Sequence, residues 1–206
     1  KMNGCSSSNT IRKTGIKPYY SVSSSQRRQY ILKQFAPDNL GYNMPGAMIV
    51  SGNMDIERFK EIFQKLVDRH EAFRTCFDIV GSHIVQRVVD KIDFTVSIEE
   101  TNELDINDIV RNFIKPFELD TPPLLRVGLY KLKQDLFVNK YLFLFDMHHI
   151  ISDGVSMEIL LTEFMSLYQG VELPACMEGQ KAVERLFETV YLLWSGGLST
   201  GNVAFR

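Results

Sequence analysis

The sequence predicts a single α/β domain. Segments with an apolar residue at every third or fourth position, typical of amphipathic helices, alternate along the chain with short apolar segments typical of strands. Hydrophobic residues make up 45% of the 206 residues and charged residues 23%, which is the composition of a globular protein with a sizeable core. This length is enough for one domain and too short for two ordinary ones.

Composition excludes several classes of protein. The 23 basic and 25 acidic residues give a net charge of -2, which argues against a nucleic-acid partner. No apolar run approaches the ~20 residues that span a bilayer, so no membrane partner is expected. The three cysteines, Cys5, Cys76 and Cys176, are widely spaced and include no CxxC pair. This pattern argues against a metal site or a disulfide scaffold and favours a soluble domain in the reducing cytoplasm.

The chain divides into three parts by composition. Residues 1–17 are rich in Ser, Asn, Gly and Lys and are typical of a linker or a disordered lead-in. Residues 18–174 hold the alternating pattern of helices and strands. Residues 175–206 form a tail of different character, in which helical spacing from Val183 to Trp194 ends at a glycine pair.

The first half of the domain begins with a helix. Ser23 is a candidate N-cap for a helix that ends near Pro37, and Asp55 is the cap of an amphipathic helix that runs to about His70. Three strands are predicted here, and the last two form a hairpin around a Gly-Ser turn: Met44–Ser51, Ala72–Val80 and His83–Val89.

The second half is predicted in the same way. Asp105 begins a helix that Pro116 ends, and another helix follows Gly154 and runs through Tyr168. Three strands are expected here: Phe94–Ile98, Leu124–Leu132 and Tyr141–Phe145. The last of these is continuously apolar, as in a strand that is buried on both faces.

The strongest site signal is the segment from Met147 to Gly154, MHHIISDG. It lies where a buried strand passes into a helix, a position where α/β sheets tend to bind ligands. Neighbouring side chains of an extended segment point to opposite faces, so only one of His148 and His149 can face a cleft. A histidine with a pKa near its ordinary ~6.5 is a suitable general base. Asp153 is placed either to pair with His149 or to bind a partner elsewhere.

Two further segments carry charged residues. Arg69 to Phe77, RHEAFRTCF, lies at a predicted helix-to-strand junction, and Ser23 to Tyr30, SSSQRRQY, begins a capped helix. Arg74 falls one residue into an apolar strand, where a guanidinium needs a carboxylate partner. We expect that partner to be Asp153.

Together these three segments resemble the signature motifs of condensation domains of nonribosomal peptide synthetases. Residues 23–28 are similar to the family's Ser-x-Ala-Gln-x-Arg motif, with Ser25 at the usual Ala position. Residues 69–77 are similar to Arg-His-Glu-x-Leu-Arg-Thr-x-Phe, with Phe73 at the Leu position. The motif His-His-x-x-x-Asp-Gly is complete at residues 148–154 and is shared with chloramphenicol acetyltransferase-like enzymes.

The resemblance implies a fold and a reaction. The fold is a chloramphenicol acetyltransferase-like sandwich lobe, a mixed β-sheet with helices packed on it. Such domains join a donor acyl or peptidyl thioester to the amine of an acceptor aminoacyl thioester, and both substrates hang on the phosphopantetheine arms of donor and acceptor peptidyl carrier domains. The chain itself is expected to bind no cofactor.

The resemblance also implies residue roles. His149 is the active-site histidine and His148 a structural neighbour. Asp153 pairs with Arg74 and shapes the site, while Gly154 leaves room for the phosphopantetheine arm. The sequence leaves open whether His149 removes the proton of the attacking amine or only positions it.

The family fold has two lobes with the active site between them, and residues 18–174 match only the N-terminal lobe. Without the C-terminal lobe we expect the isolated chain to be inactive, with an exposed apolar face that could form a homo-oligomer. Two alternatives remain: a self-contained acyltransferase that works as an oligomer, and a non-catalytic module that docks carrier domains. The two motifs outside residues 148–154 favour the condensation domain over the acyltransferase.

Overall fold

The structure is a computed structural model that describes residues 17–101, 106–133 and 139–174. Its strands form two sheets, one in the order β2–β7–β6–β5 and one in the order β1–β4–β3. Only β5 and β6 run parallel, so the larger sheet is mixed, as expected. In chain order the elements are β1 (Tyr20–Ser21), α1 (Ser24–Phe35), β2 (Gly46–Ser51), α2 (Ile56–Arg69), η1 (Glu71–Arg74), β3 (Thr75–Val80), β4 (His83–Val88), β5 (Ser97–Thr101), α3 (Ile106–Phe113), β6 (Leu125–Leu132), β7 (Lys140–Met147) and α4 (Gly154–Tyr168).

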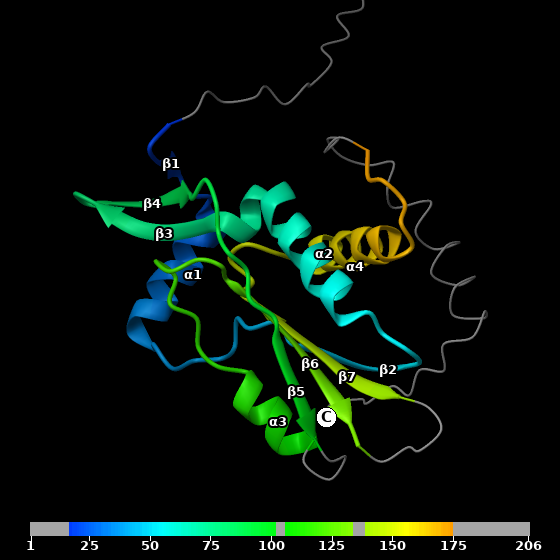
Figure 1. Ribbon diagram of the computed structural model, residues 1–206. Coiled ribbons are helices and arrows are strands. Elements are labelled where there is room, and N and C mark those ends of the chain that lie inside the picture. The colour runs from blue at the N-terminus through cyan, green and yellow to red at the C-terminus, as the bar shows by residue number, and fades with distance from the viewer. Residues whose placement is uncertain (1–16, 102–105, 134–138, 175–206) are drawn as a thin grey trace, which may run out of the picture.

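Strand β7 is the centre of the larger sheet. It pairs with β2 on one edge and β6 on the other. Because side chains alternate across a strand, Phe143 and Met147 pack into the core formed with α2 and α4. Leu142 and Leu144 pack on the opposite face with α3. The sheet is therefore the middle of three layers (Figure 1), and the predicted burial of this strand on both faces is confirmed.

Gly46 shows how closely β2 and β7 approach. Gly46 is the register partner of Phe145. A Cβ at residue 46 would lie 1.9 Å from the Cζ atom of the Phe145 ring. Only glycine leaves room for this ring, so a larger residue at position 46 would move the strand or the ring.

The smaller sheet and α1 form a second packing unit. The hairpin of β3 and β4 turns at Gly81, whose φ of 63° is in the left-handed region that favours glycine. Tyr30 of α1 and Phe77 of β3 pack in one cluster with Ile150, which lies in the loop after β7. This unit therefore contacts the segment in which the sequence predicted a site.

Two predicted strand boundaries were wrong. The strand expected from Ala72 begins at Thr75, because a 3-10 turn comes first: the Phe73 N–H donates to the His70 carbonyl. The strand expected over residues 94–98 lies at Ser97–Thr101. The Phe94 N–H donates to the side chain of Gln64 in α2, at 2.8 Å, and not to a neighbouring strand.

Some predictions fall outside the described residues. These are the lead-in over residues 1–16, the cap at Asp105 and the tail helix from Val183 to Trp194. In the part of the chain that is described, no helix has the length and apolar character needed to cross a membrane.

The aromatic core between α2 and the sheet predicts a stability difference. Phe63 is 1% exposed, and its ring centroid lies 5.0 Å from that of Phe164 and 6.0 Å from that of Phe143. Phe63→Ala should lower the free energy of unfolding by about 3–5 kcal/mol, measured by urea denaturation. Phe35→Ala is the matched control, because Phe35 is also on a helix but 84% exposed. Equal losses in the two variants would contradict this packing.

Candidate functional site

His148 is a buried residue at the end of β7. It is 3% exposed, and its ring lies between Tyr42, stacked at a centroid distance of 6.2 Å, and the edge of Phe117, at 6.1 Å. Its Nδ1 accepts the Ile150 backbone N–H at 3.0 Å, so the neutral ring carries its proton on Nε2. Burial, then the positive charges of Lys33 and His149, lower the pKa of His148 to about 4. The ring is therefore neutral near pH 7.

His149 lies one residue farther on, where the chain leaves the sheet, and is exposed. Its Nδ1 lies 2.7 Å from the carbonyl oxygen of Ser152. Because a carbonyl only accepts, Nδ1 is the donor, and Nε2 of the neutral ring carries the lone pair. The prediction that only one of the two histidines faces outward is confirmed: His149 is exposed and His148 is buried.

The backbone of both histidines is paired to residues 42–44. The His149 N–H donates to the Tyr42 carbonyl at 2.8 Å, and the Met44 N–H donates to the Met147 carbonyl at 2.7 Å. Between these bonds, Asn43 and His148 form an antiparallel bridge. The position of the His149 backbone is therefore fixed by a second segment about 100 residues away in the sequence.

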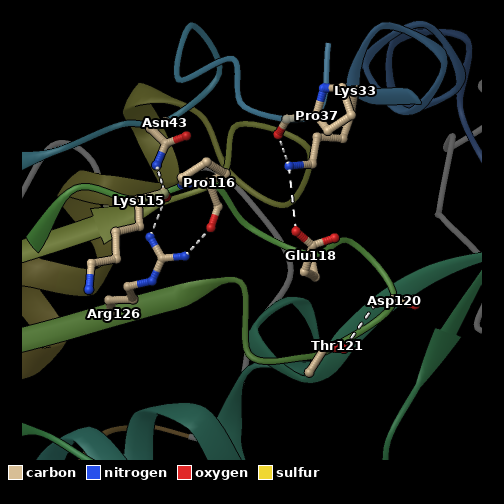
Figure 2. Close-up of polar contacts among 9 residues, drawn as sticks. All are labelled: Lys33, Pro37, Asn43, Lys115, Pro116, Glu118, Asp120, Thr121 and Arg126. Atoms are coloured by element: carbon tan, nitrogen blue, oxygen red, sulfur yellow. Dashed lines mark hydrogen bonds and ion pairs between the residues drawn. The ribbon is translucent and has the colours of Figure 1, made fainter. Parts of the chain in front are cut away.

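A polar cluster around one buried carboxylate, comprising Asn43, Arg126 and Asp146, lies beside this pairing. Asp146 is fully buried, and its Oδ2 accepts from the Asn43 amide at 2.7 Å and the Arg126 guanidinium at 3.1 Å. Figure 2 shows Asn43 and Arg126 reaching the same carbonyl, that of Lys115. Burial raises the pKa of Asp146 above its ordinary value, against the lowering effect of Asn43 and Arg126.

The motif at residues 23–28 also contacts the histidine loop. Gln26 forms a capping box with Ser23, in which the Gln26 N–H donates to the Ser23 hydroxyl and the Gln26 side chain accepts the Ser23 N–H. The amide nitrogen of the same side chain lies 3.3 Å from the Ile150 carbonyl oxygen. One glutamine therefore caps α1 and supports the loop after His149.

The motif at residues 69–77 is tied to α4 by Glu163. Arg69 Nε lies 3.2 Å from one Glu163 carboxylate oxygen, and His70 Nε2 lies 2.5 Å from the other. Burial alone would raise the pKa of Glu163, but hydrogen bonding and charge from His70 and Arg69 lower it below its ordinary value. This cluster joins the end of α2 to α4, and sequence reasoning missed it because Glu163 resembles any polar residue of a helix.

The predicted ion pair between Arg74 and Asp153 is wrong. Asp153 is exposed and caps α4, where it accepts from the Ser156 N–H at 2.8 Å and the Ser156 hydroxyl at 2.6 Å. Arg74 lies in the 3-10 turn, not in a strand, and its guanidinium donates to four backbone carbonyls, those of Val67, Asp68, Val89 and Asp90. These carbonyls satisfy the guanidinium without a carboxylate, which the argument from an apolar strand did not consider.

Gly154, the first residue of α4, is exposed. A Cβ at this position would meet no heavy atom within 4 Å. The described part of the chain therefore gives no steric reason for glycine here, and the space in front of Gly154 and His149 is open.

This arrangement limits the chemistry of the site. An exposed imidazole with a free Nε2 can accept a hydrogen bond or a proton from an N–H or O–H group. Among the described residues, no three His, Cys, Asp or Glu side chains are grouped so that they could hold a metal ion.

The buried state of His148 predicts a pH dependence of stability. Below pH 6.5 the unfolded chain binds a proton at His148, whereas the folded chain binds it only below about pH 4. The contribution of the neutral His148 ring to the free energy of unfolding is therefore complete above pH 6.5. It is lost as the pH falls from 6.5 to about 4, by about 3 kcal/mol in total.

Urea denaturation between pH 4 and 7 measures this effect. His148→Asn should show a shallower fall in stability than the parent between pH 6.5 and 4. His83→Asn is the control, because His83 is exposed on β4, and its curve should follow that of the parent. Parallel curves for the parent and His148→Asn would contradict the burial of a neutral ring.

The separate partners of Arg74 and Asp153 predict additive mutations. Asp153→Ala removes a helix cap and should cost about 0.5–2 kcal/mol. Arg74→Ala should cost more, because it leaves several carbonyls without a donor. In a double-mutant cycle the two losses in the free energy of unfolding should add to within about 0.5 kcal/mol. A larger coupling energy would indicate that Arg74 and Asp153 interact directly.

Most of this chain is similar in sequence to known proteins. Residues 16–182 match the family model of the condensation domain. The chain is 46% identical over 165 residues to tyrocidine synthase 3 of Brevibacillus parabrevis, which covers 80% of this chain and 2% of that protein. It is 48% identical over 155 residues to gramicidin S synthase 2 of Aneurinibacillus migulanus, which covers 75% of this chain and 3% of that protein. The chain thus spans a small fraction of the length of these relatives.

Solved structures show the same fold. The starter condensation domain of the rhizomide synthetase RzmA aligns with a TM-score of 0.66 at 18% identity, over 87% of this chain and 47% of that chain. The X-domain from teicoplanin biosynthesis aligns with a TM-score of 0.70 at 16% identity, over 89% of this chain and 40% of that chain. The family model, which matches most of the sequence, and the relatives near 45% identity lead to one conclusion: the chain belongs to the condensation domain family.

Proposed function

We propose that this chain supplies the histidine-bearing lobe of a domain that forms amide bonds in nonribosomal peptide synthesis. The donor is an acyl or peptidyl thioester and the acceptor is an aminoacyl thioester, each carried on the phosphopantetheine arm of a carrier domain. The observation that carries this proposal is the exposed His149 ring with Nδ1 bonded to the Ser152 carbonyl. Further support comes from an RzmA starter condensation domain mutant, which was solved in complex with C8-CoA and Leu-SNAC.

The reaction uses His149 as an acceptor. Nε2 accepts an N–H of the acceptor amine and directs the nitrogen lone pair toward the thioester carbonyl. The C–N bond forms as the amine adds, and the C–S bond breaks as the tetrahedral intermediate collapses. The proton passes from the amine to Nε2 and then to the departing sulfur, so His149 ends the cycle neutral.

The exposed surface in front of His149 must be covered by a second protein surface if it is to hold two substrates. Holding two substrates in reacting geometry is worth about 7–11 kcal/mol of the barrier. Here the ring is exposed, and the open hollow of about 570 Å³ beside α1 is lined by other residues. We therefore propose that the C-terminal lobe of a complete condensation domain closes the site, that the arm passes Gly154, and that the 206 residues alone are inactive.

A condensation assay with loaded donor and acceptor carriers tests the proposal. Residues 18–174 replace the matching segment in a condensation domain of gramicidin S synthase 2. The chimera should form the amide, and His149→Ala in it should lower kcat at least about 100-fold. The isolated chain should give no turnover.

Gly154→Ala and Val155→Ala, compared in the same chimera, test whether the phosphopantetheine arm passes Gly154. Both residues are exposed in the first turn of α4. Gly154→Ala should not lower the melting temperature, because its Cβ meets open space, but it should slow condensation in the chimera if the arm passes there. Full turnover of His149→Ala would show a non-catalytic module, and turnover by the monomeric isolated chain would show that one lobe suffices.

A further inference from the structure

We propose that the polar cluster of Asn43, Arg126 and Asp146 is a positioning centre for His149. It holds the backbone of residue 149 so that the Nδ1–H of the ring meets the Ser152 carbonyl and Nε2 remains the acceptor. This inference rests on the proposed function, in which Nε2 receives the amine N–H. None of the three residues touches the reacting atoms, so they act through the loop.

Asp146 is the centre of the cluster. It is fully buried two residues before His148, and its Oδ2 is shared by Asn43 and Arg126. Its Oδ1 has no hydrogen-bond partner among the described residues. A buried carboxylate is costly unless it is paired, so the two donors are held tightly by the one oxygen that they share. The strand end before His148 is therefore fixed in relation to both donors.

Arg126 connects Asp146 to the segment that packs on His148. Arg126 and Asp146 are direct register partners on β6 and β7. The guanidinium also donates to the carbonyls of Lys115, at 2.5 Å, and Pro116, at 2.6 Å (Figure 2). It lies 3.6 Å from the centroid of the Phe117 ring. Phe117 in turn forms the edge contact with His148. A lysine keeps the charge at this position but cannot supply this planar set of donors.

Asn43 connects Asp146 to the backbone of His149. Its amide nitrogen donates to Asp146 and to the Lys115 carbonyl. Its own backbone lies in the segment that bridges His148, and its neighbour Tyr42 accepts the His149 N–H. A shift of Asn43 therefore moves the carbonyl that holds residue 149. A displacement of 1 Å in a catalytic group is enough to reduce a rate about 100-fold.

Two variants test the cluster from its two sides. Arg126→Lys keeps the charge opposite Asp146, and Asn43→Ala removes the other donor from a half-buried loop position that should tolerate truncation. The readout is the nitrogen chemical shifts of the His149 ring in the ¹⁵N-labelled chain, which report its tautomer. The parent should show the proton on Nδ1, and both variants should show a mixture of tautomers.

Arg111→Lys is the matched control. Arg111 also pairs with an aspartate, Asp108 at 3.2 Å, but this pair is exposed on α3. Its His149 signals should equal those of the parent. In the chimera, Arg126→Lys and Asn43→Ala should lower kcat about 10- to 100-fold with little change in KM, whereas Arg111→Lys should change neither.

The outcomes separate the two proposals. Parent-like tautomer signals in folded Asn43→Ala and Arg126→Lys would overturn the positioning role, even if both variants melt at lower temperature. If Arg126→Lys fails to fold, the tautomer in Asn43→Ala alone decides. A shifted tautomer together with an inactive parent chimera would leave the positioning centre intact and contradict the proposed function.

Discussion

The burial of β7 on both faces and both edges is the constraint on which the rest of the structure depends. A strand in this position can end in polar residues only if each is paired or uncharged. Asp146 is paired with Arg126 and Asn43, and His148 is kept neutral by burial. Only at His149, where the chain leaves the sheet, can an imidazole remain open to solvent.

The loop after β7 is held from several directions, although it lies at the surface. The Ile150 carbonyl accepts from Gln26 of α1, and the His149 N–H donates to the segment before β2. At its far end the loop enters α4, which Glu163 ties to Arg69 and His70 at the end of α2. Each of the three sequence motifs thus contributes to one scaffold around the exposed His149 ring.

Sequence patterns could predict what depends on local periodicity. The apolar run from Tyr141 predicts the buried strand, and alternation predicts that His148 and His149 face opposite sides, while the family resemblance assigns the outward place to His149. Contacts that depend on register or on loop paths could not be found in this way. The pairing of Arg126 with Asp146 follows from the register of β6 and β7. The partners of Arg74 are carbonyls of the last turn of α2 and of the segment after β4, which come close to Arg74 only because it lies in a 3-10 turn and not in a strand.

The contrast between the two sides of the site bears on its function. Behind His149, its backbone N–H is bonded to the Tyr42 carbonyl, and its ring Nδ1 is bonded to the Ser152 carbonyl. In front of it, Gly154 could carry a Cβ without any contact, and Val155 is 52% exposed. Under the proposed function, this contrast suits substrates that arrive on long phosphopantetheine arms, because the backbone of His149 is held from one side while the side that the arms approach is open.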